Sequence, residues 1–155
     1  MFIRPFEIGE EDALHTLFFE SIHCLARANY TNAQLDAWAP VEYDRLAWAS
    51  RIRSNKPFVG VINGQLAGFA DLQPSGYIDH FFVSPAHARQ GVAKALMACL
   101  LQSAREMGIS SIFSNVSLTA EPVFRKYGFE VERRNEISVR GVQLNNATMR
   151  LRLEP

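Results

Sequence analysis

The chain has 155 residues, of which 48% are hydrophobic and 21% are charged, and its 16 basic residues balance its 16 acidic ones. This length predicts a single domain over residues 1–155, and the charge balance gives no reason to expect a nucleic-acid or membrane partner. No signal-peptide pattern and no apolar stretch of bilayer-spanning length is present, so a cytoplasmic location is expected. Cys24 and Cys99 are expected to be small core residues, and no metal-ligand spacing is seen.

The first third of the chain predicts a short strand followed by three helices. The strand is expected over residues 2–6, and apolar residues at helical spacing predict a helix over about 10–28. Thr31 or Asn32 is expected to cap a short second helix that Pro40 closes. A third helix is expected over about 43–53.

The middle of the chain predicts a hairpin, a strand and a long helix. Asn63-Gly64 favours a type I′ turn between strands over residues 58–62 and 65–72. The aromatic and β-branched run over residues 77–83 predicts the central strand, which Ser84-Pro85 ends. A long amphipathic helix is expected to begin at Gly91 and to end at Gly108.

The last third predicts a strand over 111–116, a short helix stopped by Gly128, and two final strands over 130–139 and 148–153. Arg140-Gly141 and Asn145-Asn146 are expected to join these two strands. The order of elements predicts one α+β domain with mostly antiparallel pairing.

The turn at Gly91 is the first sign of function. A strand that leads through a glycine-containing turn into a helix is a phosphate-binding arrangement, because backbone N–H groups at the helix start point at the anion. Gly91 and Ala93 are small, so they would let a phosphate approach those amides.

Two sequence blocks resemble the GNAT superfamily of acyltransferases. "VSP" over 83–85 and "ARQGVA" over 88–93 are similar to its acetyl-CoA motif, V-x-P followed by (Q/R)-x-x-G-x-(G/A), although Ala88 replaces the leading Gln or Arg. The second block, N-x-x-A-x-x-x-Y-x-x-x-G-F, is matched at Ala120, Gly128 and Phe129, while Ser117 replaces its asparagine and Phe124 its tyrosine. The stretches "YTNAQLDAWAP", "GFADL", "GYIDHFFV" and "GVQLNNATM" are similar to the YafP-like branch of N-acetyltransferases.

The resemblance implies a fold and a co-substrate. The expected fold is a single-domain GNAT-like one, with a mixed, mostly antiparallel sheet that splays between strands 4 and 5 and is flanked by helices. Acetyl-CoA is expected in that cleft, along the backbone of Phe81, Phe82 and Val83, one of whose amides would polarise the thioester carbonyl. Its pyrophosphate is expected at the amides of the turn and helix start, at Arg89, Gln90, Gly91, Val92, Ala93 and Lys94. Arg89, Gln90 or Lys94 would replace the polar contact that Ala88 lacks.

Direct attack by an amine needs a proton acceptor, for which Asp79 is favoured. The strand period places Tyr77, Asp79, Phe81 and Val83 on one face, and aromatic surroundings would raise the pKa of Asp79. Asp79 would otherwise be a structural acid that bonds a loop, His80 or His87, and Asp71 is the competing candidate for the base.

The leaving thiolate needs a proton, which Phe124 cannot donate. Tyr127 and Ser117 are the candidates, Tyr30 and Tyr77 are further alternatives, and solvent alone is another.

The acceptor site is expected between the first two helices and the last hairpin. Tyr30, Gln34 and Trp38 recur at spacings of four, so they share one face of the second helix and line either a pocket or a packed lid. Tyr77 is expected beside them, while His15, His23 and His87 are assigned no role.

Two function classes follow. The first is an N-acetyltransferase that moves an acetyl group from acetyl-CoA to an amine of a small molecule or peptide. A homodimer is possible. The second is a non-catalytic acyl-CoA-binding or regulatory domain on the same scaffold, which the departures at Ala88 and Phe124 keep open.

Overall fold

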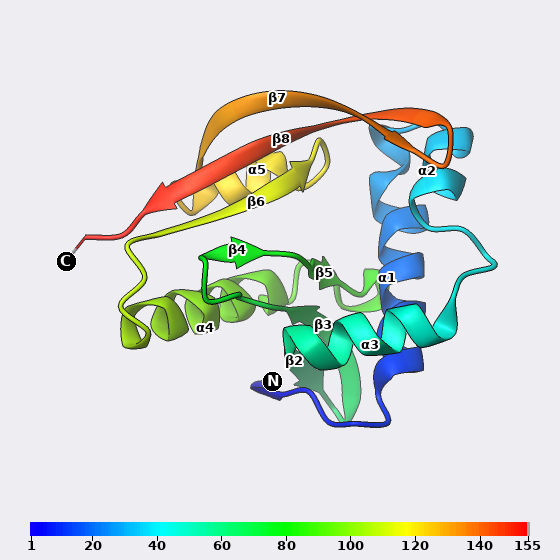
Figure 1. Ribbon diagram of the computed structural model, residues 1–155. Helices are drawn as coiled ribbons and strands as arrows, with labels where there is room; N and C mark the ends of the chain where they lie inside the picture. Colours follow the sequence, from blue (N-terminus) through cyan, green and yellow to red (C-terminus); the bar gives the residue numbers. More distant parts are fainter. Residues whose placement is uncertain (155) are drawn as a thin grey trace.

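The computed structural model describes residues 1–154 and contains two four-stranded sheets that diverge from each other (Figure 1). The first has the order β1-β2-β3-β5 and is antiparallel throughout, with strands Phe2–Pro5, Phe58–Ile62, Gln65–Ala70 and Phe81–Val83. The second has the order β4-β6-β8-β7, with strands Tyr77–Ile78, Ser111–Ser117, Val142–Arg152 and Glu130–Val139. Only the β4–β6 pair in it is parallel. The predicted α+β class and mixed, splayed sheet are therefore confirmed.

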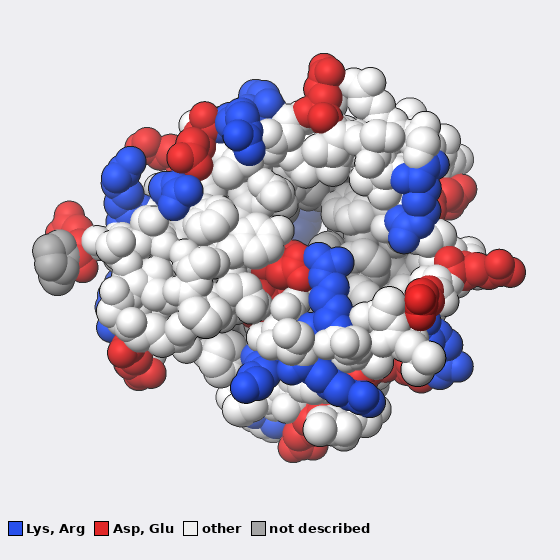
Figure 2. All heavy atoms as spheres, viewed as in Figure 1, with Lys and Arg blue, Asp and Glu red and all other residues white. Residues whose placement is uncertain are grey.

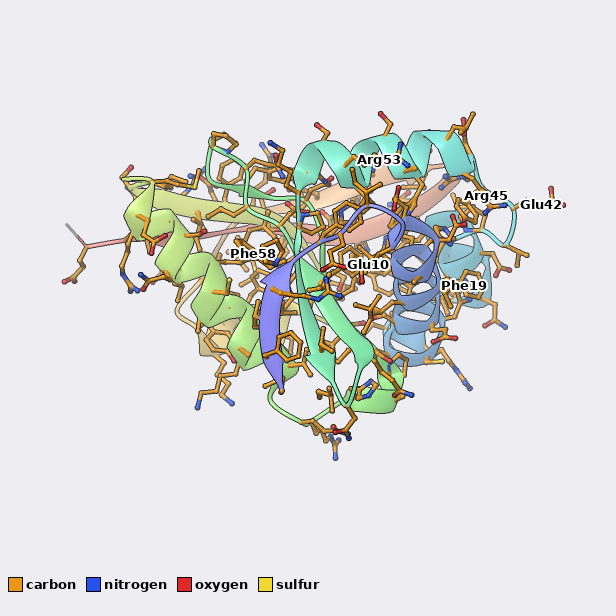
Figure 3. All side chains as sticks on the ribbon, turned by 90° about the horizontal axis from the view of Figure 1, so that it is seen from below. Glu10, Phe19, Glu42, Arg45, Arg53 and Phe58 are labelled. Atoms are coloured by element: carbon orange, nitrogen blue, oxygen red, sulfur yellow. The ribbon has the colours of Figure 1, made fainter. Side chains whose placement is uncertain are left out.

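The helices cover both faces of the first sheet. Helix α4 (Val92–Glu106) packs on β2 and β3 from one side, while α1 (Glu11–Leu25) and α3 (Arg45–Asn55) lie on the other side (Figure 3). A 3₁₀ turn (Ala26–Ala28) links α1 to α2 (Asn32–Trp38), and α5 (Glu121–Lys126) follows β6. Within residues 1–154, none of these helices has the length and apolarity needed to cross a membrane.

Local signals in the sequence fix several element ends. Thr31 caps α2 through a reciprocal pair of hydrogen bonds with Gln34, and Asn63 and Gly64 both adopt positive φ in the predicted β2–β3 turn. The prediction for the last strand was wrong, because β8 already begins at Val142 directly after the Arg140-Gly141 turn. Asn145 and Asn146 lie within β8 rather than in a second turn.

The main core lies between α4 and the two sheets. Its fully buried residues include Leu96, Met97, Leu100, Ile112 and Met149. The two cysteines were expected in a core, but Cys24 is exposed and Cys99 is half-buried.

Close contact between α4 and β3 depends on Gly68, and Gly68→Ala is expected to lower the free energy of unfolding by about 1–3 kcal/mol. The added Cβ would lie 2.8 Å from Val92 Cγ1 and 2.9 Å from the carbonyl oxygen of Phe82. Gly60→Ala is the matched control, because its nearest neighbours are side-chain ends at 3.3 and 3.4 Å. Urea denaturation should show a clearly smaller loss for Gly60→Ala, and equal losses would contradict this account of the packing.

Candidate active site

The predicted central strand is broken in two, and this break creates the site. Residues 77–78 form β4 and pair with β6, whereas residues 81–83 form β5 and pair with β3. Asp79 and His80 belong to neither strand. The second sheet therefore begins to diverge from the first at Asp79, and β5 and β6 belong to different sheets.

The carboxylate of Asp71 holds this break. It is fully buried directly after β3, and its two oxygens accept the backbone N–H groups of Asp79 at 2.9 Å and of His80 at 2.8 Å. The backbone N–H of Asp71 in turn donates to the carbonyl of His80 at 3.1 Å. The Asp71 carboxylate thus accepts the two N–H groups that backbone carbonyls of a neighbouring strand would accept in a regular sheet.

The break also changes which residues share a face. Asp79 and Phe82, three positions apart, both line one pocket, whereas the ring of Phe81 packs against Phe124 with centroids 5.4 Å apart. The expectation that Asp79, Phe81 and Val83 share one face was wrong, because it assumed an unbroken strand period.

Two backbone amides of β5 point away from its neighbour β3. In an antiparallel ladder, every second pair of facing residues is hydrogen-bonded. The N–H of Ser84 donates to the carbonyl of Ala67 and the N–H of Asp71 donates to the carbonyl of His80, so the pair between them, Phe82 and Phe69, is also a hydrogen-bonded one. The polar backbone groups of Phe82 therefore face β3, and those of Phe81 and Val83 face away from it. Since β5 is an edge of its sheet, these groups are open to an extended ligand.

The turn before α4 has the geometry expected of an anion site. Gly91 is the N-cap, with φ of 83°, and the amides of Val92, Ala93 and Lys94 in the first turn have no acceptor within the helix. The side chains of Arg89, Gln90 and Lys94 are exposed around it, whereas that of Val92 is buried against the sheet. The first turn therefore offers backbone donors with cations beside them.

On the other side of the break lies a pocket of about 440 Å³. Its walls come from α1, α2, α3, the broken strand, β6 and the β7–β8 hairpin. Figure 2 shows a hollow in the face of the molecule turned to the viewer, with atoms of acidic and basic residues side by side at its edge. The side chains that line it include His15, Phe18, Tyr30, Trp38, Tyr43, Trp48, Arg51, Asp79, His80, Phe82, Asn115, Ser117 and Arg140.

Asp79 is ion-paired inside this pocket. Arg51 bonds both of its oxygens, with Nε 2.7 Å from Oδ2, and Asn55 Nδ2 donates to Oδ2 at 2.7 Å. Burial disfavours the charge, but Arg51, together with His80 and Asn55, outweighs it and holds the pKa of Asp79 below its usual value. The predicted rise in pKa was wrong, because no sequence signal linked Arg51 to this strand. Three of about four acceptor positions on the carboxylate are used, which leaves one on Oδ1.

Asp71, Asp79 and His80 form a tight cluster, with His80 Nδ1 3.4 Å from Asp71 Oδ2 and 3.6 Å from Asp79 Oδ2. Such groups can ligate a metal, but here both carboxylates already accept hydrogen bonds from N–H donors. Because these oxygens are already occupied by N–H donors, the cluster is better suited to a fixed hydrogen-bond network than to binding a cation.

The predicted acceptor residues are only partly brought together. Tyr30 and Trp38 line the pocket, with ring centroids 5.5 Å apart, but Gln34 and Tyr77 are not among its lining residues. Gln34 instead caps α2 and donates to the carbonyl of Gln143 at 3.0 Å. Tyr30 lies in the bend before α2, so the three residues do not share a helical face.

The candidate proton donors lie in different places. Ser117 lines the pocket, and its Oγ accepts the N–H of Ala120 at 3.1 Å. Tyr127 follows α5, half-buried against the main core and not among the pocket-lining residues. Phe124 is 2% exposed. The roles of Ser117 and Tyr127 stay predictions.

Several pocket residues had no signal in the sequence. His15 was assigned no role, yet it is buried and stacks on Tyr43 with centroids 3.3 Å apart. Arg51 and Trp48 come from the third helix, which was not expected to contribute. His87, also assigned no role, is buried outside the pocket lining.

A family model for the acetyltransferase (GNAT) domain matches residues 26–153. The chain is 32% identical over 148 residues to the Escherichia coli K12 protein named "Uncharacterized N-acetyltransferase YafP", covering 96% of this chain and 93% of that one. A crystal structure of a GCN5-related N-acetyltransferase from Rhodopseudomonas palustris aligns with a TM-score of 0.94, 28% identity and coverage of 98% of this chain and 95% of that one. The acetyltransferase yncA from Salmonella typhimurium, solved with its cofactor acetyl-CoA, has a TM-score of 0.71 at 20% identity, covering 100% of this chain and 95% of that one.

Proposed function

Because the chain belongs to the GNAT family of acetyltransferases, we propose that it transfers the acetyl group of acetyl-CoA to an acceptor amine by direct attack. The observation that carries this proposal is the broken strand, which separates two half-sites. On one side are the open amides of Phe81 and Val83 and the turn at Gly91, and on the other is the pocket that holds Asp79.

The first half-site fits acetyl-CoA. The edge of β5 can pair with the amide-containing arm, and the start of α4 can hold the pyrophosphate. An N–H of Phe81 or Val83 would donate to the thioester oxygen as it gains negative charge. The structure of yncA with acetyl-CoA supports this assignment at the level of the fold.

The second half-site fits an amine. Acetyl-CoA, when bound, supplies a carbonyl carbon that the acceptor nitrogen attacks, with loss of the thiolate. The open position on Asp79 Oδ1 would accept a hydrogen bond from the incoming nitrogen and orient its lone pair. With its pKa lowered, Asp79 is a weak base, so the ammonium proton passes mainly to water.

The proton for the leaving thiolate would come from solvent, from Ser117 or from Tyr127. Phe124 occupies the position of the family's tyrosine, and its ring packs against Phe81 and Phe129. The ring is buried beneath β5 and supplies no proton. A thiolate has a pKa close enough to neutrality to leave without a dedicated acid.

The test of the function is thiol release from acetyl-CoA over a panel of amines. Asp79→Asn is expected to lower kcat/KM for the amine by about 10- to 100-fold, because the incoming nitrogen loses a hydrogen bond to a charged acceptor, worth about 1.5–3 kcal/mol. Acetyl-CoA affinity should change little, because Asp79 lies on the acceptor side of the break. Since the pKa of Asp79 is low, the acid limb of the pH–rate profile near neutrality should remain in the variant.

Asp36→Asn is the matched control, since Asp36 lies on α2 with a 74% exposed side chain. If Asp79→Asn acetylates the amine at the wild-type rate, Asp79 does not orient the acceptor. Tight acetyl-CoA binding with no thiol release from any amine would instead point to a non-catalytic acyl-CoA-binding domain.

A further inference from the structure

We infer that the acceptor is a small free amine with a flat, apolar body, and not a residue of a polypeptide. This inference rests on the acetyltransferase function proposed above. It concerns the walls of the pocket rather than the site of the chemistry.

One wall of the pocket is a continuous set of aromatic rings. Phe18 lies 5.0 Å from both Trp48 and Phe82 between centroids, and Phe82 lies 6.4 Å from Trp38. All four rings are half-buried, so each still presents surface to the hollow. Ring surface in a concave site is best covered by another flat apolar group, through area burial and edge or face contacts.

The side of the pocket between α2 and the β7–β8 hairpin is closed. Tyr30 Oη and Gln34 Nε2 donate to backbone carbonyls of β8 at 2.7 and 3.0 Å, and Arg140 at the hairpin tip donates to the carbonyl of Ala37 at 2.6 Å. Figure 1 shows the end of this hairpin against α2. An extended polypeptide that crossed the pocket in this direction would have to break these bonds, whereas a compact molecule would not.

The size and charge of the pocket also favour a small acceptor over a peptide or a polyamine. A cavity of about 440 Å³ lies near the lower end of small-molecule sites and is too small for several residues of a peptide. Its two arginines, Arg51 and Arg140, balance its two aspartates, Asp44 and Asp79. The pocket therefore carries no negative excess that would select a polyamine or a lysine-rich segment.

The test compares four acceptors with the full chain: 2-phenylethylamine, n-butylamine, spermidine and a hexapeptide with a free N-terminus and one lysine. We expect kcat/KM for 2-phenylethylamine to exceed each of the others by at least about tenfold, which is about 1.4 kcal/mol of barrier. Trp38→Leu keeps an apolar side chain but removes the flat ring. It should lower the ratio of phenylethylamine to butylamine about five- to tenfold.

Phe19→Leu is the matched control, because Phe19 is a half-buried ring on α1 outside the pocket lining, and its ratio should equal that of the wild type. Peptide or spermidine turnover equal to that of phenylethylamine would overturn the inference and leave the acetyltransferase function standing. Equal rates for phenylethylamine and butylamine would overturn it as well. No thiol release with any amine would refute the proposed function itself. The wild-type comparison decides the question even if Trp38→Leu proves unstable.

Discussion

Gly91→Glu is expected to weaken acetyl-CoA binding by more than about 100-fold, which corresponds to roughly 2.7 kcal/mol. Gly91 has φ of 83°, a conformation that costs an ordinary residue roughly 1–2 kcal/mol. The new carboxylate would also compete with the pyrophosphate for the amides at the start of α4. Isothermal titration calorimetry with acetyl-CoA gives the affinity, and circular dichroism checks the fold.

Gly108→Glu is the control that distinguishes a change at the proposed pyrophosphate site from the general effect of adding a charge and a strained residue to α4. Gly108 ends the same helix, has φ of 69° and is open to solvent, so the substitution adds the same charge and a similar strain at the opposite end of α4. Normal acetyl-CoA affinity is expected there. If both variants bind acetyl-CoA as the wild type does, the pyrophosphate does not lie at Gly91.

Asp71→Ala is expected to lower the free energy of unfolding by about 3–5 kcal/mol, because two backbone N–H groups at the strand break lose their acceptors. Asp71→Asn keeps one acceptor oxygen and should lose less. Urea denaturation measures both. Asp44→Ala serves as the control, since Asp44 caps α3 through a single exposed N–H bond, worth about 1 kcal/mol.

The same Asp71 variants should also lose activity beyond their loss of stability. With the carboxylate gone, Asp79 and Phe82 would no longer be held on the pocket face together. Acetylation assayed well below the unfolding temperature should therefore fall in Asp71→Ala, and an unchanged rate in a folded variant would show that the break does not depend on this side chain.

The sequence predicted those features that are set by neighbouring residues. The hairpin turn at Asn63-Gly64, the cap at Thr31 and the turn at Gly91 each depend on the backbone preferences of a few adjacent residues. The motif around Gly91 also carried the family resemblance. Short-range signals of this kind are enough to predict these parts of the fold, including the turn that we propose binds acetyl-CoA.

The features that were missed depend on residues far apart in the sequence. The strand break is fixed by Asp71, eight positions before Asp79, and the low pKa of Asp79 depends on Arg51, twenty-eight positions before it. Side-chain periodicity cannot reveal such partners, because it describes one element at a time. The full lining of the pocket around Asp79 was harder still to predict, since it comes from segments that range from His15 to Asn146.

The division of the site at the strand break has an evolutionary consequence. The open edge of β5 and the turn at Gly91 lie within one continuous segment, residues 77–106, whereas the pocket walls also come from α1, α2, α3 and the β7–β8 hairpin. Substitutions in these outer segments would alter the proposed acceptor pocket without touching the segment that would bind the acetyl donor. The proposed division would let the acceptor pocket change in evolution while the donor half-site stays the same.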